Sequence, residues 1–281
     1  MSQGEMSFWG HLDALRRVLV RIALIIVVFA VVFFIYMPWI FDHVITAPCS
    51  GDFIMYRMLG FIHGDGTWIP DMASGEDFHV DLINIELASQ LFVHISASCW
   101  LAFIVAFPFV IYQLWTFISP GLYEHEKRNA RVAFLMGNLM FYLGMAVGYF
   151  IVFPLALRFL ADYQLSENIA NTVSLTSYID TFFMLVLMLG LVFELPLLAW
   201  VLGKMGLLKR SFFKRYRKHA IAAIVILSGM ITPTSDIFTL VMVFVPVYML
   251  WEASAWLVPA YNQSAKSIPE NDEKNKTGSA T

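Results

Sequence analysis

Two acidic residues stand beside basic residues just after a long uncharged stretch. Glu124 and Glu126 follow a helix-breaking Pro120 and precede Lys127 and Arg128. A carboxylate binds a guanidinium through two parallel hydrogen bonds, each worth about 1.5–3 kcal/mol because the groups are charged, whereas an ammonium lacks that geometry. The pattern predicts a loop that captures an arginine. The alternative is that both acids pair with Lys127 and Arg128 on a solvated loop.

A third carboxylate, Glu194, lies within an apolar run. An acidic residue near the middle of a membrane costs about 2.5–3.5 kcal/mol, so function is the default interpretation of such a residue. Pro196 follows, and because it lacks an N–H it frees a carbonyl one turn earlier and predicts a kink. The alternative is a protonated glutamic acid that ties two helices together, and both roles can hold at once.

Two further features indicate helix geometry rather than chemistry. Asp236 stands just before an apolar segment, where it is typical of a helix N-cap. Gly144 and Gly148 are spaced so that two helices can pack closely.

The sequence lacks the patterns that most enzymes and metalloproteins need. It has no phosphate-binding glycine-rich loop, no His and Cys residues at metal-binding spacing, and no His-Glu-x-x-His. We therefore expect no enzyme activity, no cofactor and no metal.

Composition explains what must position these residues. The chain of 281 residues is 59% hydrophobic and only 14% charged, and the stretches 22–41 and 91–123 carry no Asp, Glu, Lys or Arg. About 20 apolar residues in a helix cross a hydrocarbon core about 30 Å thick. We predict an all-α membrane protein with six transmembrane helices, in which prolines bend the bundle into a curved shape and the fifth and sixth spans are short. The predicted spans are 18–40, 89–117, 132–154, 179–202, 219–231 and 237–256.

Basic residues predict the orientation. Of the 18 Lys and Arg residues, 16 fall on one side of these spans, all but Arg57 and Arg158. The positive-inside rule places that side, and both termini, in the cytoplasm. The expected organisation is a membrane domain over 1–263, with a first outward loop at about 41–88 built of turns and a short amphipathic helix, and a disordered cytoplasmic tail over 264–281.

From about residue 8 to residue 256 the chain resembles the TatC family of twin-arginine protein translocases, and five ordered motifs carry the resemblance. They are Phe8-Trp-Gly-His-Leu-Asp-Ala-Leu-Arg-Arg17, Tyr112-Gln-x-Trp-x-Phe-x-x-Pro-x-Leu-Tyr-x-x-Glu126, Tyr142-x-Gly-Met-x-x-x-Tyr-Phe-x-Val-Phe-Pro154, Phe193-Glu-x-Pro196 and Thr232-Pro-x-x-Asp236. The resemblance implies a receptor in the bacterial inner membrane that binds Arg-Arg signal peptides of folded cargo, without catalysis of its own. It also implies a multimeric complex driven by the proton-motive force.

The resemblance carries roles to particular residues at the cytoplasmic face. It implies that Glu126 clamps a signal arginine and that Arg16 orders the site. The patch around the clamp would be shaped by Phe117, Pro120, Leu122 and Tyr123. The family places an acid two residues before the arginine that Arg16 matches, where this chain has Ala14. The second clamp therefore stays open between Asp13 and Glu124.

The resemblance also implies contacts within the membrane. Glu194 matches a glutamate that faces a membrane pocket and the single-span partners TatA and TatB, and Asp236 matches an acid of the outward hairpin. The family often has a glutamine where this chain has Leu240, so Thr239 is the nearest polar group.

Two other functions compete with a receptor. An ion-coupled secondary transporter would use Glu194 as its proton carrier, although the two halves of the sequence show no internal repeat. A purely structural scaffold would leave the cytoplasmic acids without a role.

Overall fold

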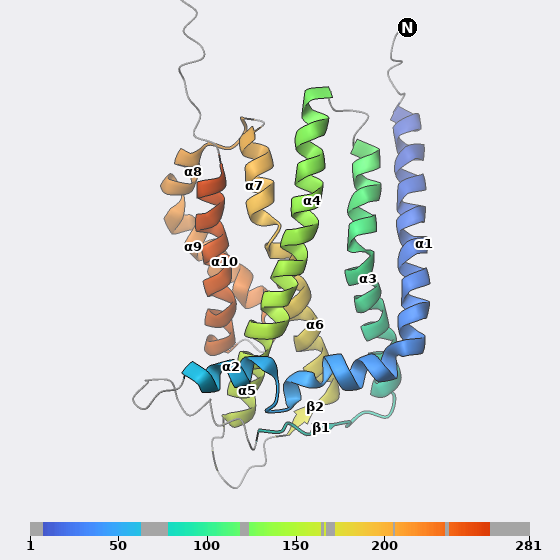
Figure 1. Ribbon diagram of the computed structural model, residues 1–281, viewed down its shortest axis with the longest axis vertical. Coiled ribbons are helices and arrows are strands. Elements are labelled where there is room, and N and C mark those ends of the chain that lie inside the picture. The colour runs from blue at the N-terminus through green and yellow to red at the C-terminus, as the bar shows by residue number, and fades with distance from the viewer. Residues whose placement is uncertain are drawn as a thin grey trace, which may run out of the picture.

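The computed structural model consists almost wholly of helices standing side by side (Figure 1). The structure describes residues 8–62, 78–118, 124–163, 166, 172–204, 206–233 and 236–258, with the backbone alone at 8–9, 11, 59–62, 118 and 124–131. Within these ranges, the long helices are α1 (Phe8–Ile40), α3 (Ser89–Ile118), α4 (Glu124–Val147), α6 (Leu175–Val192) and α10 (Ile237–Leu257). The predicted tail 264–281 lies outside the described residues.

Five helical stretches are long and apolar enough to cross a membrane. In the described part of the chain they are Leu12–Cys49, Ser89–Phe117, Val132–Asp162, Leu175–Lys204 and Ile237–Leu257. The chain is therefore a multi-pass all-α membrane protein, as predicted. The predicted fifth span is the helix α9 (Arg217–Ile231), whose 15 residues rise only about 22 Å. The predicted sixth span, α10, has 21 residues and is long enough to cross a membrane, so it is not short as predicted. It continues beyond its uncharged core to Glu252, which pairs with Arg217 at 2.7 Å.

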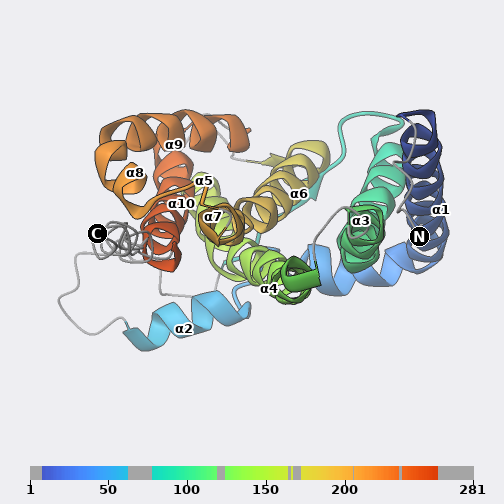
Figure 2. The ribbon, with the colours of Figure 1, turned by 90° about the horizontal axis from the view of Figure 1, so that it is seen from above.

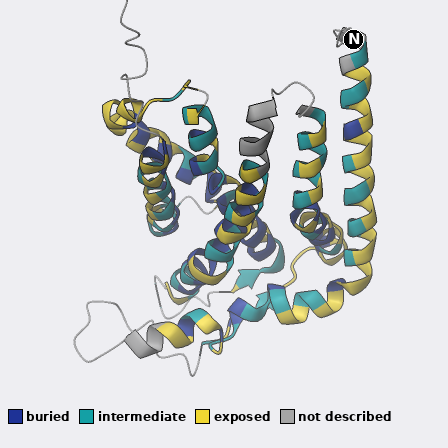
Figure 3. Cartoon of the chain, turned by 45° about the horizontal axis from the view of Figure 1, so that its top comes forward, coloured by how far each residue is buried: buried dark blue, intermediate teal, exposed yellow. Residues whose placement is uncertain are grey.

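The helices form an open row rather than a closed cylinder. Seen from above in Figure 2, α1 and α3 lie at one end and α10 lies at the other, beside α9 and the short α8 (Arg210–Arg215). Buried residues concentrate on α6, which packs against α3, α4, α9 and α10. Figure 3 shows that α1, in contrast, is exposed along most of its length. The core therefore sits around α6, and the α1–α3 pair extends from it.

Glycines allow α4 and α6 to approach each other. A Cβ atom built on Gly144 would lie 2.6 Å from the carbonyl oxygen of Leu189, and one on Gly148 would lie 2.9 Å from Cα of Val186. These distances are too short for any side chain, so the predicted role of the two glycines in close packing is confirmed.

Proline shapes two of the long helices. Pro38 in α1 cannot donate to the carbonyl of Phe34, and that carbonyl instead accepts a hydrogen bond at 2.8 Å from Nε2 of His94 on α3. The predicted kink near Pro196 is also present: α6 ends at Val192, and α7 (Leu195–Lys204) begins after a turn that contains Glu194.

Several short elements lie at the end of the molecule opposite the N-terminus. They are the π-helix η1 (Phe41–Ile45), the 3-10 helix η2 (Ala47–Cys49), α2 (Ile54–Ile62), the π-helix η5 (Gly148–Val152), α5 (Phe153–Asp162) and the strands β1 (Leu82–Ile83) and β2 (Val173–Ser174). The two strands pair in parallel, with Leu82 opposite Val173 and Ile83 opposite Ser174.

Tyrosine hydroxyls satisfy carbonyls where α1 and its π-helical extension end. The hydroxyl of Tyr149 donates to the carbonyl of Val44 at 2.8 Å, and that of Tyr178 donates to the carbonyl of Ile45 at 2.5 Å. The last carbonyls of a helix have no partner within it. These bonds therefore connect η1, which continues α1, to η5 and α6.

Candidate functional site

Five of the predicted arginine-binding residues lie on three helices whose ends are at the same end of the molecule: Asp13 and Arg16 on α1, Phe117 on α3, and Glu124 and Glu126 on α4. Figure 1 shows the start of α1, the end of α3 and the start of α4 at the end marked N. Asp13 and Arg16 are exposed on α1, and Phe117 is half-buried near the end of α3. Because Asp13 and Arg16 are three residues apart, they share one side of the helix.

Glu124 and Glu126 do not lie in a loop, and that expectation is wrong. Both fall in the first turn of α4, which begins at Glu124. A helix N-terminus carries a partial positive charge that favours carboxylates, so acids are well placed in a first turn. Pro120, Leu122 and Tyr123 lie outside the described residues, as do the side chains of Glu124 and Glu126.

Glu194 lies in the turn between α6 and α7 and is half-buried. Its side chain lies beside α4. A Cβ atom built on Gly137 of α4 would lie 3.1 Å from its Oε2 and 3.5 Å from its Oε1. Its carboxyl group therefore occupies the space that the missing side chain of Gly137 leaves. Its Oε1 is buried and has no hydrogen-bond partner among the described residues. This polar atom needs a donor that the described part of the chain does not supply.

Asp236 and Thr239 meet at the start of α10, at the end opposite the predicted arginine site. The Thr239 backbone N–H donates to Oδ1 of Asp236 at 2.7 Å, so the predicted N-cap is confirmed. The Thr239 side chain is fully buried, and its hydroxyl has no hydrogen-bond partner in the described ranges.

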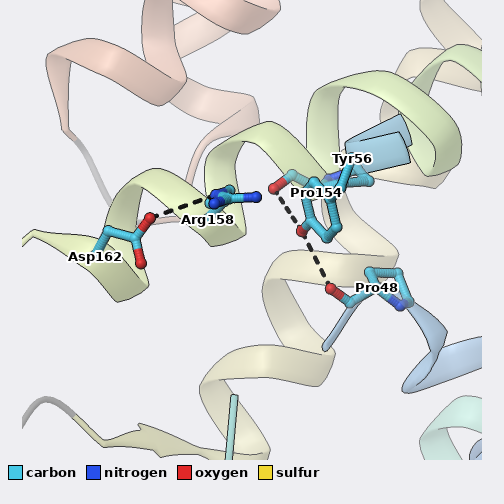
Figure 4. Close-up of polar contacts among 5 residues, drawn as sticks. All are labelled: Pro48, Tyr56, Pro154, Arg158 and Asp162. Atoms are coloured by element: carbon cyan, nitrogen blue, oxygen red, sulfur yellow. Dashed lines mark hydrogen bonds and ion pairs between the residues drawn. The ribbon is translucent and has the colours of Figure 1, made fainter. Parts of the chain in front are cut away.

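The sequence did not reveal a buried polar cluster at the outward-predicted end (Figure 4). The Tyr56 hydroxyl lies 3.1 Å from the carbonyl oxygen of Pro48 and 3.0 Å from that of Pro154, so its single proton is shared between them. Arg158 lies close by, 5.3 Å from the centre of the Tyr56 ring and 3.5 Å from Asp162. Burial raises the pKa of the Tyr56 phenol, with a smaller opposing effect of Arg158, so the phenol remains a donor.

One signal could have found this cluster. Arg158 is a cation inside the apolar stretch 151–161 and is only 3% exposed. A buried charge needs partners, but the sequence does not show that they come from α2, about a hundred residues earlier.

Comparisons with known proteins identify the family of the chain. Residues 10–246 match the family described as Sec-independent protein translocase protein (TatC). The chain is 30% identical to the TatC protein of Blattabacterium over 91% of its own length and 96% of that protein. It is 31% identical to the TatC protein of Campylobacter jejuni, covering 94% of this chain and 97% of that one.

The fold also matches solved structures. A crystal structure described as the twin-arginine translocase receptor TatC aligns with a TM-score of 0.68 at 30% identity, covering 88% of this chain and 97% of that one. The same receptor crystallised in the detergent DDM aligns with a TM-score of 0.70 at 29% identity, covering 89% and 99%. By its sequence and its fold, the chain belongs to the TatC family of Sec-independent protein translocase proteins.

Proposed function

We propose that this member of the TatC family is the receptor that binds Arg-Arg signal peptides for a twin-arginine translocase. It would act in the bacterial inner membrane with both termini in the cytoplasm and would carry out no catalysis itself. The observation that supports this most is the near full-length match to translocase proteins, including a structure described as the receptor. The predicted arginine-binding residues that the structure describes also lie on helices whose ends are at the same end of the molecule.

Glu126 is the proposed clamp for a signal arginine. It lies in the first turn of α4, where the partial positive charge of a helix N-terminus is compatible with an acidic residue, and a carboxylate can bind a guanidinium through two hydrogen bonds. Glu124 is two positions away on the same helix, which is a rotation of about 200°. Positions 124 and 126 therefore lie on nearly opposite faces of α4. The second clamp is either Glu124 on α4 or Asp13 on α1.

Glu194 is the proposed contact for single-span partners of the TatA and TatB type. Its side chain is only half-buried, and its Oε1 lacks a donor among the described residues. A polar side chain on a partner helix would complete that hydrogen bond. Transport of folded cargo would then draw on the proton-motive force.

Binding of a signal peptide by the purified chain tests the receptor function. A fluorescent peptide with an Arg-Arg pair should bind the unaltered chain, and Glu126→Ala should weaken binding at least tenfold, because a charged bond worth about 1.5–3 kcal/mol is lost. A Lys-Lys peptide should bind poorly to both.

Two further variants complete this experiment. Asp13→Ala and Glu124→Ala remove one carboxylate each, and the one that weakens binding identifies the second clamp. Equal binding of the Arg-Arg peptide by the unaltered chain and Glu126→Ala would reject the proposal and favour a scaffold. Uptake of a substrate by the chain alone in vesicles would favour a transporter.

A further inference from the structure

A strongly cationic surface surrounds α8, at the same end of the molecule as the N-terminus (Figure 1). We define the α8 surface by its exposed basic side chains, which are Lys209, Arg210, Lys214, Arg215 and Lys218. No acidic residue occurs in the sequence from 204 to 219. In the described part of the chain none of the five belongs to an ion pair, whereas the neighbouring Arg217 pairs with Glu252. The five positive charges therefore remain uncompensated.

Contacts with α10 set the level of the α8 surface in the membrane. The ring of Phe213, the buried residue of α8, lies 4.7 Å from the ring of Trp251, and Arg217 bonds to Glu252 one residue further along α10. These contacts place α8 beside the last turns of a membrane-spanning helix. Tyr216, directly after α8, and Trp256, at the end of α10, are both exposed. Exposed Trp and Tyr side chains are typical of the headgroup region of a bilayer.

Apolar side chains stand among these charges. Phe212 and Leu207 are exposed, at 42% and 69% respectively. In water such exposure has a cost, but at a membrane surface both side chains can enter the acyl boundary while the cations stay among the headgroups. The α8 surface thus combines the two features of a segment that lies on a lipid surface.

We infer that the α8 surface binds the phosphate groups of anionic phospholipids. Juxtamembrane clusters of four to eight basic residues are attracted to anionic lipids, with a gain of about fivefold in affinity for each residue near the surface. Arginine adds paired hydrogen bonds to phosphate oxygens. Bound anionic lipid would offset the repulsion among the five cations and hold α8 at the headgroup level. This inference does not depend on the proposed signal-peptide function.

Lipid selection by the purified full chain tests the inference. The chain in detergent is mixed with equal amounts of dioleoylphosphatidylglycerol and dioleoylphosphatidylcholine, and the lipids it retains are counted by native mass spectrometry. We expect retention of the anionic lipid to exceed that of the zwitterionic lipid at least tenfold, and to fall as salt is added. Arg210→Gln with Arg215→Gln should remove most of that preference, because each lost charge costs about fivefold in affinity.

A matched control keeps the test specific. Arg17→Gln with Arg21→Gln removes the same charge from two exposed arginines of α1 and should leave most of the preference in place. Equal loss in both pairs, or no preference in the unaltered chain, would overturn the inference. Retention of a hexaglutamate peptide without any preference among lipids would also overturn it, because the surface would then suit an acidic protein segment.

Discussion

At the scale of single residues, one tyrosine hydroxyl joins η2 and α2 to α5, which follows 98 residues later. Tyr56 on α2 reaches the carbonyls of Pro48 and Pro154 and lies under the guanidinium of Arg158. The first residues after α1 are thereby joined to α5. The sequence placed Arg158 on the outward side but did not show its partners, because a side-chain contact across about a hundred residues leaves no local signal.

Tyr56→Phe should destabilise the chain. Its loss leaves two buried carbonyls without their shared donor, which we expect to cost about 1–3 kcal/mol. Thermal unfolding in detergent, followed by circular dichroism, measures the change. Tyr36→Phe is the control, because Tyr36 is 61% exposed on α1 and its substitution should leave the melting temperature unchanged. Identical melting temperatures for the two variants would show that the Tyr56 hydroxyl carries no stability.

His94 and Pro38 should depend on each other. His94→Phe removes the donor to the Phe34 carbonyl, at an expected cost of about 1 kcal/mol or more. In a Pro38→Ala background the restored N–H can serve that carbonyl within α1, so the same substitution should cost much less. A double-mutant cycle of unfolding temperatures provides the comparison. Additive effects would mean that His94 does not replace the bond that Pro38 removes.

At the scale of elements, uncharged stretches predicted the helices well. Helix α3 begins at Ser89 and α10 at Ile237, at the predicted residues. The predicted helix start was wrong where a helix extends into a charged segment. Helix α4 begins at Glu124, eight residues before the predicted span, because acids and bases are compatible with a helix outside the hydrocarbon. The β1–β2 pair was not predicted, because a contact of two residues per strand depends on the fold around it.

The packing of α4 on α6 makes a prediction about glycines. Gly144→Ala should destabilise the chain by about 1–3 kcal/mol, because its Cβ would lie 2.6 Å from the backbone oxygen of Leu189 and the helices would have to separate. Gly229→Ala in α9 is the matched control. Its Cβ would meet only Leu240 at 3.8 Å, and alanine favours a helix over glycine by about 0.8–1 kcal/mol. A Gly144→Ala variant as stable as Gly229→Ala would contradict the close approach.

At the scale of the whole molecule, the two ends carry different chemistry. The start of α4 and the α8 surface lie at the end marked N in Figure 1, and the strands with α2 lie at the other. The positive-inside rule predicts that the first end faces the cytoplasm. Sequence alone placed the candidate residues on this side, but their mutual arrangement depends on how α1, α3 and α4 pack.

Cysteine labelling tests this orientation. Cys99→Ala leaves the buried Cys49 as the only native thiol, and Ser211→Cys or Asp81→Cys then adds an exposed one at either end. A membrane-impermeant maleimide should label Asp81→Cys in intact spheroplasts and Ser211→Cys only in inverted vesicles. The reverse pattern would place the proposed arginine clamp outside the cytoplasm and would contradict the proposed receptor function.

The proposed receptor function depends on the pairing of the Glu126 carboxylate with a guanidinium of the signal peptide. A double-mutant cycle between the chain and the peptide measures this pairing directly. Affinities are determined for the unaltered chain and for Glu126→Gln, each with the Arg-Arg peptide and with peptides in which one arginine is replaced by lysine. We expect a coupling energy of about 1.5 kcal/mol or more between Glu126 and one of the two arginines. Effects that simply add, with no coupling to either arginine, would contradict it.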